Sequence, residues 1–204
     1  MRVIAGRYKG RRLKTPTWEG LRPTSDKLRE TLFNVLAPRM VGARVFDGYA
    51  GTGAVGIEGL SRGAAHVTFV ERDRRAIALI THNLAACGIE QGYTIRCAEV
   101  GAALDVLPVS DAFDLILLDP PYDNDRLPFV LVVAARHVTA GGLVVLEHAT
   151  RTEPEVPAGL TRVRGIRSGD SSITLLSRDS GFAPRQARGA LSVSKGGVRD
   201  SEGE

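Results

Sequence analysis

The chain has 204 residues, of which 43% are hydrophobic and 25% are charged. These values are typical of one globular domain with its own core, and they argue against a fibrous or largely disordered chain. No apolar run is long enough to span a membrane, and the N-terminus has no apolar signal-peptide region. We therefore expect a cytoplasmic protein without a membrane partner. Cys87 and Cys97 lack metal-ligand or CxxC spacing, which predicts no metal site and a reducing compartment.

The net charge of +4 is unevenly distributed along the chain. Residues 1–40 have a balance of +7, residues 41–160 of −6 and residues 161–204 of +3. A basic front segment indicates a polyanionic partner, although a solvated basic surface would have the same composition.

The first forty residues predict a small basic extension. Short strands at 2–5 and 12–13 flank a glycine-bounded loop, which indicates a β-hairpin. A loop follows, and a helix should begin at Thr24 as N-cap and end at Pro38. Trp18 lies in the basic loop, where it would either stack on RNA or pack against the domain. The candidate phosphate contacts are Arg7, Lys9, Arg11, Arg12 and Lys14.

From residue 41 onward, strand and helix patterns alternate. Strands are expected at 43–47, 66–71, 93–97, 113–118 and 142–147, with a late hairpin at 160–163 and 173–176. Helices are expected at 54–60, 74–87 (capped by Asp73 and stopped by Gly88), 102–107 and 126–138. This alternation predicts an α/β fold: a doubly wound, mainly parallel Rossmann-like sheet with a terminal antiparallel hairpin. The expected parts are an extension at 1–40, a domain at 41–178 and a disordered tail at 179–204.

A glycine-rich loop follows the first strand of this domain. Asp47-Gly-Tyr-Ala-Gly-Thr-Gly53 joins that strand to the next helix, and Glu71 ends the second strand, in position to bind ribose hydroxyls. Gly51, Gly53 and Gly56 also satisfy the GxGxxG dinucleotide pattern, so the loop alone does not separate NAD from another adenosine cofactor. The Asp47 carboxylate, however, suits a cationic ligand better than a diphosphate.

A second unusual stretch, Asp119-Pro-Pro-Tyr122, follows the apolar strand at 113–118. Neither proline has an N–H and both fix φ, so the loop is stiff and offers a carboxylate and free carbonyls. These groups can accept hydrogen bonds from an amine while the ring of Tyr122 stacks on a base. An ordinary turn after a strand is the alternative.

Taken together, the two motifs resemble the class I S-adenosylmethionine-dependent methyltransferases that modify exocyclic amines. More narrowly, the chain resembles the RsmD family of 16S rRNA guanine-N2 methyltransferases. The segments that carry this resemblance are Met1–Gly6, Gly10–Leu13, Arg22–Thr24, Arg29–Glu30, Leu32–Asn34, Phe46–Asp47, Ala50–Gly51, Gly53–Ala54 and Leu60–Ala64. The chain departs from the family at Gly48-Tyr49, where bulky apolar residues are usual, and at Glu99, where aspartate is usual.

The resemblance implies methyl transfer from S-adenosylmethionine to the N2 amine of a guanine in 16S rRNA. It implies that Asp119 and the Pro120 carbonyl accept the amine hydrogens, and that Tyr122 stacks on the flipped-out base. The implied cofactor contacts are Asp47, Ala50, Gly51, Gly53, Glu71, Arg72, Glu99 and Asp119, with Arg22 and Thr24 bordering the pocket. We expect a monomer, without metal, acting on rRNA in an assembling small subunit.

Three alternatives remain open at the level of the sequence. A DNA or other RNA amino-methyltransferase would use the same loop, although a DNA enzyme would normally carry a separate target-recognition domain. An NAD-dependent oxidoreductase would satisfy the glycine pattern, and a non-catalytic RNA-binding protein would need only the basic segment. The scattered histidines, none of which lies beside a motif, are assigned no catalytic role.

Overall fold

The computed structural model describes residues 1–18, 26–121 and 124–179. Seven strands form one sheet in the order β3-β2-β1-β4-β5-β7-β6. In chain order they are β1 (Arg44–Gly48), β2 (His66–Glu71), β3 (Tyr93–Cys97), β4 (Phe113–Leu118), β5 (Val138–Ala149), β6 (Leu160–Ser168) and β7 (Ser171–Arg178).

The first five strands of the chain pair in parallel, whereas β7 pairs antiparallel with both β5 and β6. The central strands β1 and β4 are buried along nearly their whole length because both of their faces are covered, as is usual in parallel sheets. The prediction of a doubly wound, mainly parallel sheet with a terminal antiparallel hairpin is confirmed.

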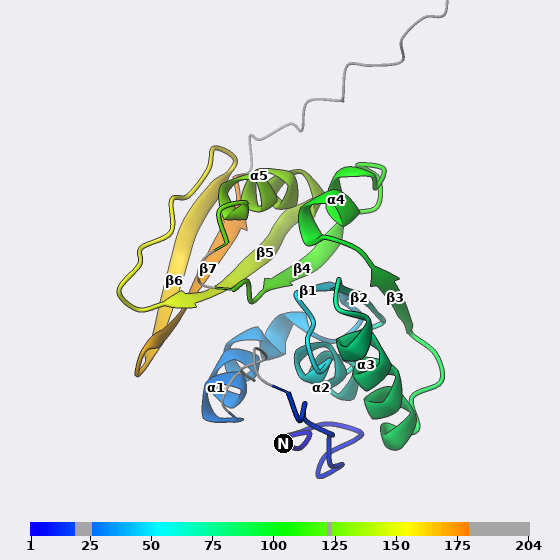
Figure 1. Cartoon of the computed structure of the whole chain (residues 1–204). Helices are drawn as coiled ribbons and strands as arrows, with labels where there is room; N and C mark the ends of the chain where they lie inside the picture. The colour runs from blue at the N-terminus through cyan, green and yellow to red at the C-terminus, as the bar shows by residue number, and fades with distance from the viewer. Residues whose placement is uncertain (19–25, 122–123, 180–204) are drawn as a thin grey trace, which may run out of the picture.

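Helices cover both faces of the sheet (Figure 1). On one face, α1 (Asp26–Leu36), α2 (Ala54–Ser61) and α3 (Arg74–Cys87) pack on a core cluster that includes Phe33, Ile57 and Ile80. On the other face, α4 (Val100–Asp105) and α5 (Leu127–His137) pack on a second cluster. A short 3-10 helix, η1 (Ala37–Arg39), follows α1.

Helix α3 has the termini that its sequence predicts. The Asp73 side chain accepts a hydrogen bond from the backbone N–H of Arg75, which satisfies one of the free donors of the first turn. Gly88 follows the helix with φ of 72°, a left-handed conformation that glycine adopts without strain. Both predicted caps are confirmed.

Other boundaries differ from the prediction. Strand β5 begins at Val138, immediately after α5, and is twice as long as expected because its first residues pair with the start of β4 across an irregularity. Helix α4 begins two residues earlier than predicted, and β6 and β7 extend well beyond their expected ends. Longer strands are possible here because nearly every residue of β6 and β7 gains a ladder partner, which composition alone does not reveal.

The two segments of the predicted N-terminal hairpin pair through an antiparallel bridge between Arg2 and Arg12 and through three backbone hydrogen bonds between residues 1–3 and 10–13, although neither segment is a full strand. Val3 and Leu13 are buried in the same core cluster as α1 and α2. The division of the chain at residue 40 stays a prediction. The predicted Thr24 N-cap and most of the predicted tail lie outside the described residues.

The direction of winding reverses between β1 and β4, since β2 and β3 continue on one side of β1 and β5 lies beyond β4. In open α/β sheets, ligands bind outside the carboxyl ends of the strands at such a point. The fold therefore indicates a ligand site near the carboxyl ends of β1, β2 and β4.

Candidate cofactor and base site

Three carboxylates lie where β1, β2 and β4 end: Asp47, Glu71 and Asp119. Asp47 is buried, and its Oδ2 accepts a hydrogen bond of 2.9 Å from the backbone N–H of Gly56 in α2. Glu71 and Asp119 are half-buried. The negative charges of both act on Asp47, so the three groups share one electrostatic environment.

The pKa of Asp47 is raised to about 8. Burial is the largest cause, because it disfavours the charged form of the carboxyl group; the charges of Asp119 and Glu71 add to it. The hydrogen bond from Gly56 acts in the opposite direction. A cation placed at this edge of the sheet would relieve the repulsion and favour the ionised Asp47.

Glu71 connects the glycine loop to the start of α3. Its Oε2 accepts from the N–H of Gly51 at 3.0 Å, and its Oε1 accepts from the N–H groups of Arg72 and Asp73 at 2.8 and 2.9 Å. One carboxylate therefore fixes both the loop that follows β1 and the turn that follows β2.

The glycine loop has the backbone that its sequence predicts. Gly51 and Gly53 have φ of 54° and 75°, and Gly53 precedes the first residue of α2. Gly56 is needed for close packing, because a Cβ there would lie 2.2 Å from the Phe69 ring. Ala50, which is buried, donates its N–H to the Val70 carbonyl at 3.1 Å.

Tyr49, one of the departures from the family pattern, is a non-glycine residue with φ of 61°. Such a backbone is strained for most residues and is often found at functional loops. The Tyr49 hydroxyl accepts a hydrogen bond of 2.7 Å from the Asn124 side chain. The glycine loop is thereby attached to the segment that follows the Asp-Pro-Pro-Tyr motif.

Arg72 and Glu99 form an exposed ion pair, with Nη1 2.9 Å from Oε1. Arg72 follows β2 and Glu99 precedes α4, so the pair lies beside the ends of β2 and β3. The structure thus brings Arg72 and Glu99, both predicted cofactor contacts, together beside Glu71, one of the three carboxylates.

The Asp-Pro-Pro-Tyr loop is described in part. Pro120 is buried and Pro121 is exposed, consistent with a chain that leaves the sheet at this point. Tyr122 lies outside the described residues, as do Arg22 and Thr24. Their predicted roles stay predictions.

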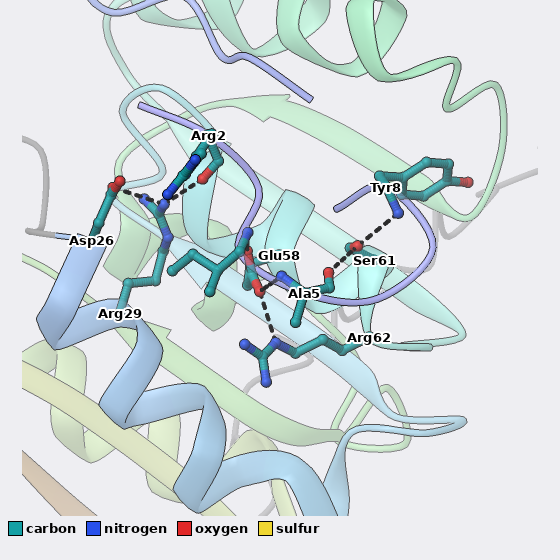
Figure 2. Close-up of polar contacts among 9 residues, drawn as sticks. Arg2, Ala5, Tyr8, Asp26, Arg29, Glu58, Ser61 and Arg62 are labelled. Carbon is teal, nitrogen blue, oxygen red and sulfur yellow. Dashed lines mark hydrogen bonds and ion pairs between the residues drawn. The ribbon is translucent and has the colours of Figure 1, made fainter. Parts of the chain in front are cut away.

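The basic N-terminal segment is held on α2 by buried side chains rather than by a strand partner (Figure 2). The carboxylate of Glu58 accepts from the N–H groups of Ile4 and Ala5 at 2.8 and 3.0 Å, and from Arg62 Nε at 2.7 Å. The Ser61 hydroxyl accepts from the N–H of Tyr8 and donates to the Ala5 carbonyl. Because these contacts use the backbone of the segment, its basic side chains remain exposed.

All five predicted phosphate contacts, Arg7, Lys9, Arg11, Arg12 and Lys14, are exposed. A second anchor lies at Lys14, whose backbone N–H donates to Asn83 Oδ1 at 2.8 Å. The Asn83 Nδ2 donates to the carbonyls of both Lys14 and Thr52, at 3.1 and 2.9 Å. Asn83 is fully buried in α3 and ties the basic segment to the glycine loop.

Trp18 packs against the domain, with the Arg75 guanidinium 5.0 Å from its ring centroid. A different arginine, Arg29 of α1, is buried and donates from Nη2 to the Arg2 carbonyl at 2.7 Å and to Asp26 Oδ1 at 3.0 Å (Figure 2). Burial lowers the pKa of Arg29 from its usual value.

The sequence analysis missed Glu58, Ser61, Asn83 and Asn124. The first three lie in helices among apolar neighbours, and nothing in the spacing distinguishes a polar residue that binds a distant backbone from one that faces solvent. The excess of glycine and arginine in the first fourteen residues was an indirect signal, since a segment with few apolar residues needs polar anchors to stay ordered.

Within residues 1–18, 26–121 and 124–179, no three His, Cys, Asp or Glu side chains are close enough to hold a metal ion. No helix within those residues has the length and apolar character needed to cross a membrane.

The chain is similar to a family model and to several known proteins. The family model described as Conserved hypothetical protein 95 matches residues 1–177. The Escherichia coli protein named Ribosomal RNA small subunit methyltransferase D is 40% identical over 163 residues, which are 80% of this chain and 79% of that protein. YlbH of Bacillus subtilis is 36% identical over 168 residues, covering 80% of this chain and 91% of that protein.

Among solved structures, yhhF from Escherichia coli is similar with a TM-score of 0.77 and 32% sequence identity. The match covers 88% of this chain and 98% of that chain. The family match at residues 1–177 includes the basic segment, the glycine loop and nearly all of the late hairpin. The chain belongs to this family, the RsmD family of methyltransferases.

Proposed function

We propose that this methyltransferase transfers a methyl group from S-adenosylmethionine to the exocyclic N2 amine of a guanine in small-subunit ribosomal RNA. The observation that carries the proposal is the grouping of Asp47, Glu71 and Asp119 at the reversal of the sheet, next to a stiff Pro-Pro loop. The name of the Escherichia coli relative supports rRNA as the substrate class.

The site fits the proposed cofactor. Three acidic side chains favour a ligand with positive charge, and the glycines at 51 and 53 let the backbone approach it closely. A nicotinamide dinucleotide would instead bring a diphosphate towards the buried carboxyl of Asp47. Asp47 would hold the amino-acid part of S-adenosylmethionine, Glu71 the ribose hydroxyls, and Arg72 with Glu99 the side of the adenine.

When bound, S-adenosylmethionine supplies a methyl group on a sulfonium, so that an N–C bond forms as the C–S bond breaks and one amine proton is released. The amine of guanine is a weak nucleophile because its lone pair is delocalised into the ring. The protein therefore has to orient the amine and accept its hydrogens as the nitrogen becomes tetrahedral. Asp119 and the Pro120 carbonyl are the proposed acceptors.

Access to an amine inside a folded RNA requires that the base leave its stack. Tyr122 is the proposed stacking partner of the flipped-out base. The exposed basic side chains between Arg7 and Lys14 are proposed to bind phosphates around it, and their fixed anchoring on α2 and α3 supports that role. The proposed enzyme acts as a monomer on rRNA within an assembling small subunit.

The test is to methylate small-subunit particles from cells that lack this protein, with labelled S-adenosylmethionine, and to map the product by mass spectrometry. A single N2-methylguanine in the small-subunit rRNA is the expected product. Methylation of another base or of DNA would assign the chain a different substrate. An S-adenosylhomocysteine titration tests whether the purified protein binds this class of cofactor.

A further inference from the structure

The outer edge of the sheet carries a row of arginines that the proposed function does not use. Strand β6 contains Arg162, Arg164 and Arg167 and no acidic residue, and all three side chains are exposed. Figure 1 shows β6 at the edge of the sheet opposite β3. We propose that this edge is a second RNA-contact surface that binds backbone phosphates near the target nucleotide, an inference that rests on the proposed function.

An irregularity in β6 distributes the arginines over both faces of the edge. Arg162 pairs with Leu176 whereas Arg164 pairs with Leu175, so Val163 is an extra residue without a partner in the ladder. Leu176 belongs to the core cluster beneath α4 and α5, and Leu175 to the cluster beneath α1 to α3. Since paired residues share a face, Arg162 and Arg164 lie on opposite faces. The edge is therefore cationic on both sides.

On the α5 side of the sheet, Arg162 and Arg167 line a shallow hollow together with Thr150, Ser172 and His148. The hydroxyls of Thr150 and Ser172 are 2.9 Å apart, and His148 is held with Nε2 2.9 Å from Thr174 Oγ1. The Thr150 hydroxyl donates to the Gly169 carbonyl at 3.0 Å and therefore accepts from Ser172, so the guanidinium groups are the donors in this hollow that suit a phosphate oxygen.

The arginine charges of β6 are only partly neutralised. Glu153 pairs with Arg162. By contrast, Arg164 and Arg167 form no ion pair with any residue in the described ranges, although Asp170 lies nearby in the turn before β7. These two arginines are the ones available to an external anion.

The surface on β6 lies toward the carboxyl ends of the parallel strands, where the proposed active site also lies. Ala149, the last residue of β5, pairs with Ser171, so the turn between β6 and β7 is at the carboxyl end of the parallel strands. Three strand intervals separate β6 from β4, which is roughly 14 Å at the usual spacing of about 4.8 Å. The basic N-terminal segment lies over α2 and α3, beyond β4 from this edge. An RNA bound across the carboxyl edge would meet basic groups on both sides of Asp119.

Arginines on an edge strand have another possible role, which is to protect the strand from pairing with other molecules. Charged residues on exposed edges prevent pairing with strands of other molecules. The two explanations differ in what happens when the charge is removed, because protection predicts self-association and RNA contact predicts weaker binding with a smaller dependence on salt.

The experiment compares the full-length double variant Arg164→Gln/Arg167→Gln with wild type and with Arg136→Gln. Arg136 is a suitable control because it lies on α5 and pairs with Asp105, away from the carboxyl edge. Affinity for small-subunit rRNA is measured as a function of salt, together with S-adenosylhomocysteine affinity, melting temperature and size-exclusion profile. The double variant should lose up to about two units of salt slope, one for each phosphate contact. Its KM for RNA should rise while kcat and S-adenosylhomocysteine affinity stay at the wild-type values.

Replacement of both arginines by lysine should restore most of the slope, because lysine keeps the charge. A slope equal to that of wild type, with or without self-association of the glutamine variant, would overturn the proposal. Absence of any rRNA methylation by the wild type would instead refute the proposed function, and the salt slopes would still decide whether this edge contacts RNA.

Discussion

Gly6 lies so close to the end of α2 that a Cβ atom on it would stand 1.8 Å from the carbonyl oxygen of Ser61. No side chain fits at that distance. The same carbonyl accepts a hydrogen bond of 2.7 Å from the N–H of Arg7. The bond that docks the basic segment therefore depends on the absence of a side chain one residue earlier.

Gly6→Ala should release this segment from α2. Gly10 provides a matched control, since both glycines have φ of +83° but a Cβ at Gly10 would meet nothing within 4 Å. Gly10→Ala should therefore lower the free energy of unfolding by the backbone strain alone, about 1–2 kcal/mol. Gly6→Ala should lower the melting temperature further and weaken RNA binding. Thermal unfolding and RNA titration of both variants check this, and equal effects would show that the contact with Ser61 contributes nothing.

The second prediction concerns Glu71. Glu71→Ala should weaken S-adenosylmethionine binding by about 1.5–3 kcal/mol, or roughly 10- to 100-fold, the range for a hydrogen bond to a charged group. Glu71→Gln should lose less, because it keeps one acceptor oxygen for the loop. Calorimetry with S-adenosylhomocysteine measures both. An unchanged affinity in Glu71→Ala would remove this residue from the cofactor site.

The third prediction uses the raised pKa of Asp47. An unfolded aspartate titrates near 3.9, whereas burial holds the folded pKa at about 8. The favourable contribution of the protonated group is thus complete below about pH 4, and it is lost as the pH rises through about 8. The free energy of unfolding should fall across this window, by up to about 1.4 kcal/mol per pH unit. Denaturant titrations of wild type and Asp47→Asn from pH 5 to 9 should show this slope in the wild type alone.

Cofactor binding should oppose the preference of the folded protein for protonated Asp47. A cationic ligand favours the ionised Asp47, so binding below pH 8 should release a proton from the wild-type protein. Calorimetry in two buffers of different ionisation enthalpy measures the proton count. The same count in Asp47→Asn as in wild type would mean that another group is the source.

The fourth prediction concerns Asp119. If its carboxylate accepts an amine hydrogen at the transition state, Asp119→Ala should reduce the rate constant about 10²- to 10³-fold, corresponding to about 2.7–4 kcal/mol. The effect should appear in kcat rather than in cofactor affinity. Asp119→Asn should retain more activity, since it keeps the shape and one acceptor oxygen.

Single-turnover methylation of small-subunit particles measures these rates, with S-adenosylhomocysteine binding and melting temperature as controls for the fold. Full activity in a folded Asp119→Ala protein would place the chemistry elsewhere. The Asp-Pro-Pro-Tyr stretch would then be a turn after β4 and no more.

The sequence predicted the sheet and the three carboxylates for one physical reason. Asp47, Glu71 and Asp119 each lie at the carboxyl end of a mostly buried strand, and parallel strands bring their carboxyl ends to one edge. The anchoring of the first fourteen residues could not be predicted in this way. Glu58 and Asn83 bind backbone groups 53 to 69 residues away, and no local periodicity encodes such contacts. Glu58 binds the N–H groups of Ile4 and Ala5, which the backbone hydrogen bonds between residues 1–3 and 10–13 do not use.

The side chains of Glu58 and Asn83 also join the first fourteen residues to α2 and α3. The N–H groups of Ile4, Ala5 and Lys14 are protected from solvent by side chains of α2 and α3, so they exchange hydrogen whenever those helices fray. We therefore expect the first fourteen residues and the two helices to unfold as one cooperative unit, to which the glycine loop is joined through Thr52. A ligand bound at that loop should lengthen the lifetime of the whole unit and keep the basic segment in place without touching it.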